Sequence, residues 1–162
     1  PEPAFIEEIR EYVKNYPEVV GIHDLMVHDY GPGRKFISFH AEVPSDSDIN
    51  YAHDVIDCIE RDMHEKFGCI VTIHLDPIVT GNREVDEMRA LAEEAAKEVD
   101  PAFTIHDFRM TSGGKHTNLI FDLCIPADCK REDEEAAKEV AERISRKNPN
   151  CFAVIHPEHP FV

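Results

Sequence analysis

The chain has 162 residues, and its 17 basic and 33 acidic side chains leave a formal charge of -16 at pH 7. Hydrophobic residues make up 42% of it, which is typical of a folded globular protein and excludes a disordered chain. Such a negative surface repels phosphate backbones and anionic headgroups and attracts cations. We therefore expect neither nucleic acid nor a direct lipid surface among its partners.

Features that are missing from the sequence suggest the cellular compartment of the protein and whether the chain is a fragment. No apolar run approaches the ~18 residues that span a bilayer, and no signal-peptide pattern opens the chain. The chain begins with Pro1 and not with Met, so we expect a soluble fragment of a longer protein. Five cysteines without a CxxC pair indicate a reducing compartment; they are Cys58, Cys69, Cys124, Cys129 and Cys151.

The first half of the chain reads as helix, strand, strand, helix, strand. Helical spacing of apolar residues, alternation and turn signals predict these elements at 3–15, 19–28, 36–43, 48–67 and 69–75. The turn Tyr30-Gly31-Pro32-Gly33 separates the two strands, and Asp76-Pro77 is expected to close the third. The second predicted helix has an apolar stripe formed by Ile49, Ala52, Ile56, Ile59 and Met63.

The same order returns in the second half, with elements predicted at 84–98, 103–110, 117–125, 131–147 and 151–157. Ile22-His23-Asp24 corresponds to Ile105-His106-Asp107, and Pro44 precedes His74 by the same interval as Pro126 precedes His156. We predict a tandem duplication, with one unit at 1–80 and a diverged copy at 81–162. A three-stranded sheet covered by two helices is an α+β, ferredoxin-like αββαβ unit whose other sheet face stays open.

Strand parity places several metal-ligating side chains on that open face. In strand 36–43, Ile37, Phe39, Ala41 and Val43 form the apolar set, so His40 points the other way. In strand 69–75, the same alternation puts His74 opposite the core, and Asp76 continues its face. Two imidazoles and a carboxylate offer the donors that zinc or manganese takes in proteins.

For two further histidines, residue alternation does not determine which face of the element the side chain occupies. His23 lies in a strand that is apolar on both faces, and His53 lies at the border of the helix stripe. Each alone is more typical of a solvated side chain than of a ligand. The metal hypothesis depends on the set, above all on the His74-x-Asp76 pair.

These residues carry a resemblance to a known family. Gly21-Ile22-His23-Asp24-Leu25, His40, His53 and Thr72-Ile73-His74-Leu75-Asp76-Pro77 together resemble the cytoplasmic C-terminal domain of cation diffusion facilitators. That family exports divalent ions in exchange for protons. The resemblance covers residues 5–77 and extends more weakly to the second half.

The resemblance implies a metallochaperone-like domain that forms a homodimer on the cytoplasmic side of the cell membrane, next to the membrane-spanning portion of the same transporter. It implies metal binding by His23, His40, His53, His74 and Asp76, with zinc as the first expectation and manganese or iron as alternatives. In the family the Asp can bridge two ions, and a helix histidine can come from the partner subunit. Metal would tighten the dimer, and protons would compete for the imidazoles below pH ~6.5.

The second copy keeps His106 and His156 but has different residues at the other ligand positions. Asp122 stands in place of His40, Glu135 in place of His53 and Glu158 in place of Asp76. This set, His106, Asp122, Glu135, His156 and Glu158, predicts a weaker second site with more oxygen ligands, suited to manganese, magnesium or iron. The other interpretation is a degenerate copy kept for packing.

Several alternatives stay open. A structural dimerisation domain without functional metal fits the same fold, and so does a small-molecule regulatory domain, although the chelating cluster counts against the second. An enzyme is not expected, because the sequence has no nucleophile elbow, Gly-rich phosphate loop or HExxH helix. Whether the repeats pair within one chain or between chains is also open.

Overall fold

The computed structural model describes residues 3–159 and shows an α+β protein with four helices and six strands. The chain divides after Ile78 into two compact units. None of the helices in the described part is long and apolar enough to cross a bilayer.

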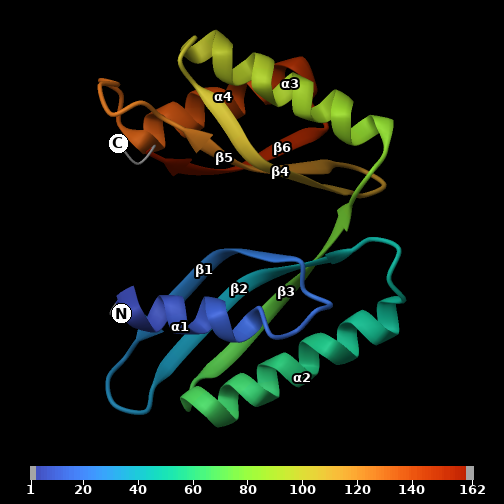
Figure 1. Cartoon of the computed structure of the whole chain (residues 1–162), viewed down its shortest axis with the longest axis vertical. Helices are drawn as coiled ribbons and strands as arrows, with labels where there is room; N and C mark the ends of the chain where they lie inside the picture. The colour runs from blue at the N-terminus through green and yellow to red at the C-terminus, as the bar shows by residue number, and fades with distance from the viewer. Residues whose placement is uncertain (1–2, 160–162) are drawn as a thin grey trace. The chain divides into compact units, whose positions relative to one another are not determined.

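The first unit has the predicted element order. It consists of α1 (Pro3–Val13), β1 (Gly21–Asp29), β2 (Lys35–Pro44), α2 (Ile49–Phe67) and β3 (Ile70–Val79). β2 lies in the middle of this sheet, antiparallel to β1 and parallel to β3, so that α2 makes the crossover that a parallel pair requires. Both helices lie on one face of the strands (Figure 1), which leaves the opposite face without a helix.

The core of the first unit forms where the two helices meet β2 and β3. Ile37, Phe39 and Ala41 of β2 are fully buried, as parity predicted. They pack in one cluster with Ile56, Ile59 and Met63 of the helix stripe. Ala52 of the same stripe is also buried. Ile49 was wrongly included in that stripe and is exposed, because it is the first helical residue, directly after the N-cap Asp48, and lies outside the packed turns.

The prediction that Asp76-Pro77 closes the third strand is also wrong. β3 continues to Val79, and Pro77 lies in the parallel ladder opposite Val43. A proline lacks only its own N–H, so it is tolerated in a strand where that donor is not needed. The extension matters because it keeps Asp76 inside the sheet, with its side chain held on a defined face.

The second unit repeats this order with α3 (Arg83–Val99), β4 (Thr104–Ser112), β5 (Thr117–Cys124), α4 (Asp133–Lys147) and β6 (Cys151–Glu158). β5 is antiparallel to β4 and parallel to β6, and α3 and α4 cover one face (Figure 1). Asn82 caps α3 through a hydrogen bond from the Val85 amide. The acidic run 132–135 forms the N-cap and first turn of α4, where its negative charge interacts favourably with the helix dipole.

Each unit has a bulge at the same place in its first strand. The register of β1 against β2 shifts between His23 and Met26, and that of β4 against β5 shifts between His106 and Arg109. Asp24 and Asp107 within these bulges have positive φ angles of 51° and 50°, which cost energy for residues other than glycine. Bulges re-aim neighbouring side chains, and here the residue just before each bulge is a histidine.

Candidate metal centre

Three histidines form a row across the open face of the first sheet, one from each strand. His23 is the register partner of His40, and His40 is the register partner of His74. Their ring centroids are 4.8 Å and 4.7 Å apart. The strand pairing, and not local sequence, therefore brings together side chains that are more than fifty residues apart.

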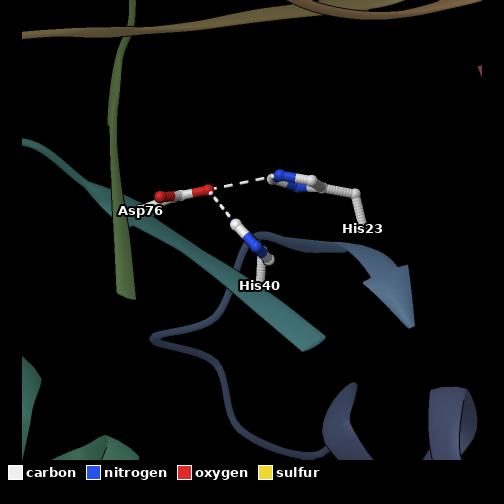
Figure 2. Close-up of side chains that lie close together, drawn as sticks. All are labelled: His23, His40 and Asp76. Carbon is white, nitrogen blue, oxygen red and sulfur yellow. Dashed lines mark hydrogen bonds and ion pairs between the residues drawn. The ribbon is translucent and has the colours of Figure 1, made fainter. Parts of the chain in front are cut away.

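Asp76 is the shared partner of this row. Its Oδ2 atom lies 3.2 Å from His23 Nε2 and 2.9 Å from His40 Nδ1. Figure 2 shows both imidazoles pointing at that one oxygen. The other oxygen, Oδ1, lies 3.2 Å from Nε2 of the more exposed His74. The carboxylate is largely buried, so these interactions are shielded from water.

Glu42 is a member of the site that the sequence analysis missed. Its Oε1 atom lies 2.8 Å from His23 Nδ1, and its side chain is fully buried. It is the register partner of Asp76 and follows His40 by two residues, so it shares the face of both. The signal was present as His40-x-Glu42 in a strand, the same spacing as His74-x-Asp76.

The charges in this group stabilise one another. Burial opposes a charge on His23, but hydrogen bonds to Asp76 and Glu42 outweigh it and raise the pKa of His23 to about 9. Burial likewise opposes the negative charge of Asp76, but the hydrogen bonds from His23 and His40 outweigh it and lower the pKa of Asp76. In the absence of metal, the centre therefore holds an imidazolium at neutral pH, with the carboxyl groups of Asp76 and Glu42 on either side of it.

The geometry fits a divalent ion. Ligand atoms from His23, His40 and Asp76 all lie within 4.8 Å of one another. Around a tetrahedral zinc, ligand atoms at about 2.0–2.2 Å from the metal lie roughly 3.3–3.5 Å apart, close to the hydrogen-bond distances found here. An ion could thus replace the shared protons with small side-chain movements. His74 lies beside this three-residue group, with its Nε2 atom 3.2 Å from the other oxygen of Asp76.

His53 is not part of this group. It lies on α2 with its side chain exposed, and its Nδ1 atom is 3.7 Å from Asp57 one turn further along the helix. Among the described residues, the structure brings together His23, His40, His74 and Asp76 from the predicted set, and leaves His53 outside it.

The second unit also brings ligands together, and two of them, His106 and Glu158, belong to the predicted set. Ligand atoms of His106, Cys124 and Glu158 lie within 4.8 Å of one another. Asp122 is the register partner of both His106 and His156, and burial together with the negative charges of Glu158 and Asp107 raises its pKa. Glu135 lies on the exposed first turn of α4 and is outside the group. The sequence analysis missed Cys124 as a ligand. Its signal was its position in the repeat, which is equivalent to that of Glu42 in the first unit.

The approach of Gly21 to Glu42 gives a first test of the buried carboxylate. A methyl group at Gly21 would lie 2.6 Å from Glu42 Oε2 and would force that side chain to move. We expect Gly21→Ala to cost about 1–3 kcal/mol of stability in urea unfolding and to lower the pKa of His23 in an NMR titration. Gly114→Ala is the control, because a methyl group there meets nothing within 4 Å. An unchanged His23 titration in Gly21→Ala would show that Glu42 does not hold this imidazole.

Comparison with known proteins identifies the first unit. A family model described as the cytoplasmic domain of cation efflux proteins matches residues 1–78. Residues 1–78 belong to this family. The family's short name, ZT_dimer, denotes a dimerising domain, and the family comprises transporter domains and not enzymes.

Individual relatives match over a length similar to that of the family model. The cation-efflux pump FieF of Salmonella newport is 38% identical over 79 residues, and FieF of Salmonella typhi gives the same identity and span. The match takes in 48% of this chain and 26% of FieF, so the chain spans about a quarter of the curated relatives it matches.

Solved structures of CzrB, a protein proposed to be a zinc transporter, match over 48% of this chain. The zinc form shows 31% identity, 89% of its chain covered and a TM-score of 0.44. A second CzrB structure shows 32% identity, 96% coverage and a TM-score of 0.45.

Proposed function

We propose that this chain is the metal-sensing cytoplasmic part of a divalent-cation efflux transporter. The observation that carries the proposal is the convergence of His23, His40 and Asp76 from three strands onto one point. The chain's charge of -16 would favour the approach of cations. The transport activity itself would belong to a membrane-spanning portion of the same protein, on whose cytoplasmic side this domain would lie.

Zinc is the ion that the first centre suits best. Two imidazoles and one carboxylate, with His74 or water in a fourth position, make a tetrahedral set of borderline ligands. CzrB is a neighbour in a zinc form, which agrees with this choice. Manganese and iron, which accept the same donors, are the alternatives that a competition titration would separate.

Homodimerisation through the open sheet face is the second part of the proposal. Met26, Phe36 and Ile70 are exposed apolar side chains, and by register they lie in the sheet whose open face carries the histidine row. Phe36 and Ile70 are direct neighbours across β2 and β3. A second copy would bury this apolar surface, and the metal would offset the repulsion between two acidic chains.

His53 fits this arrangement better than it fits a site within one chain. Its exposed position on α2 leaves it able to reach a partner subunit. We infer that it completes the metal site across the dimer, so that metal and dimerisation are coupled. In the transporter, closure of the dimer would report a high cytosolic metal concentration.

We also infer that the second unit is a tandem copy of the ferredoxin-like first unit. The repeated αββαβ order, the equivalent bulges and the equivalent strand registers support this inference. The functional division would then be a metal-binding dimerisation domain at 1–80 and a diverged repeat at 81–162.

A zinc titration of the metal-free protein tests the proposal. We expect His40→Asn to weaken zinc binding at the first site by about 100-fold or more in calorimetry, because it removes one of the three proposed zinc ligands. His28→Asn is the matched control, since His28 is exposed on β1 and stacks on Tyr30. Light scattering on the same samples should show zinc strengthening the dimer of the wild type but not that of His40→Asn.

The opposite result points to a different function. A dimer that is present throughout, with no saturable binding lost in His40→Asn, would leave a structural dimerisation domain. Binding of an organic ligand in place of metal would favour a small-molecule regulatory domain.

A further inference from the structure

We propose that the second unit carries its own metal site, in which the Cys124 thiolate binds zinc or another thiophilic divalent ion together with His106 and Glu158. The three ligand atoms lie within 4.8 Å of one another, although the residues come from three different strands. The family match does not reach this unit, since it ends at residue 78.

The backbone positions of these three residues are those of the first centre. His106 precedes the bulge in β4 as His23 precedes the bulge in β1. Cys124 pairs with Glu158 in the same register in which Glu42 pairs with Asp76. Thus Cys124 occupies the position of Glu42, Glu158 that of Asp76 and His106 that of His23.

The backbone of the second unit is strained at the same place as that of the first. Asp107 has a φ of 50°, a conformation that costs of order 1–3 kcal/mol for a residue other than glycine. In both units the histidine just before the bulge lies close to a carboxylate of the third strand, Asp76 in the first unit and Glu158 in the second.

The donor set determines which ion is favoured. One imidazole, one thiolate and one carboxylate form a tetrahedral set with one open position, and thiolates select zinc over manganese or magnesium. This differs from the oxygen-rich set expected from Asp122, Glu135 and Glu158. Arg109, the nearest basic residue along β4, is paired with Asp107 at 2.6 Å.

Cys124 is available as a ligand. It is a free thiol that is partly exposed, and it is close to His106 and Glu158. Cys129 in the following loop has the same intermediate exposure but lies outside the cluster. The pair therefore provides a ligand candidate and a matched control in the same unit.

Cobalt(II) is the probe for the test, because a cobalt–thiolate bond has a charge-transfer absorption that imidazole and carboxylate ligands lack. We expect one such absorption in the wild-type chain, which saturates once both sites of the chain are filled with cobalt and is removed by zinc. It should be lost in Cys124→Ser, and kept in Cys129→Ser and in His40→Asn. Zinc should also slow the alkylation of Cys124 by at least about tenfold, measured by peptide mass spectrometry, without protecting Cys129.

Two results would overturn the proposal: cobalt binding without the thiolate absorption, or an absorption that survives Cys124→Ser. If Cys124→Ser does not fold, the alkylation experiment on the wild type decides alone, and equal alkylation of Cys124 with and without zinc refutes the site. If His40→Asn loses zinc binding at the first site and keeps the cobalt–thiolate absorption, the two sites are independent of each other.

Discussion

Replacing Asp76 with Asn is expected to abolish tight zinc binding by the first unit and to destabilise its metal-free form. Asp76 contacts all three histidines of the row. The amide keeps the shape and one acceptor but loses the charge that pairs with the buried His23 imidazolium. Breaking a buried pair from one side costs about 3 kcal/mol, because the other charge is left uncompensated.

The measurements are urea unfolding without metal and calorimetric titration with zinc. We expect a loss of about 2–3 kcal/mol in the first and at least about a 100-fold weaker zinc affinity in the second. Asp57→Asn is the control, because Asp57 is another aspartate beside a histidine but is half exposed. Its unfolding free energy should change by less than about 0.5 kcal/mol. A zinc affinity in Asp76→Asn within tenfold of the wild type would contradict the assignment of this centre.

The second large effect is an opposite pH dependence of the metal-free and the zinc-loaded protein. The pKa of His23 is about 9 in the folded chain and close to 6.5 in an unfolded one. The folded state therefore binds the proton more tightly, and its stabilisation is fully present below pH ~6.5 and lost as the pH rises towards 9. The lowered pKa of Asp76 adds stability that is present above pH ~4 and is lost as the pH falls further.

With zinc the trend between pH ~6.5 and 9 reverses. The ion must displace the proton from His23, so its affinity rises with pH up to the pKa of that imidazole. Competition by protons thus begins near pH 9 and not near pH 6.5, the value expected for an isolated histidine. We expect binding at neutral pH to release close to one proton at His23.

Urea unfolding across this pH range, with and without zinc, measures both slopes, and calorimetry in buffers of different ionisation enthalpy counts the released protons. His23→Asn should flatten both curves, whereas His28→Asn should leave them unchanged. Metal-free stability that does not fall between pH ~6.5 and 9 in the wild type would show that the imidazolium is not held as described.

Much of the fold was predictable because the hydrophobic pattern is local. The apolar alternation in β2 and the helical stripe of α2 each lie within twenty residues, and local patterns of this kind predicted the element order and the buried face. The same parity placed His40, His74 and Asp76 on the open face of the sheet. Two predictions from local pattern were wrong. Ile49 was assigned to the apolar stripe but lies before the packed turns of α2, and Pro77 was expected to end the third strand but is accommodated in the parallel ladder.

Only the tertiary structure decided which side chains meet. His23 joins the site because a bulge at Asp24 re-aims it, and Glu42 and Cys124 join theirs because parallel pairing sets them beside Asp76 and Glu158. These contacts join residues that are 19 to 53 positions apart (42 − 23 and 76 − 23) in the first unit. Periodicity along one strand fixes which face a side chain occupies, but the register between strands, set by the whole packed core, fixes its neighbours.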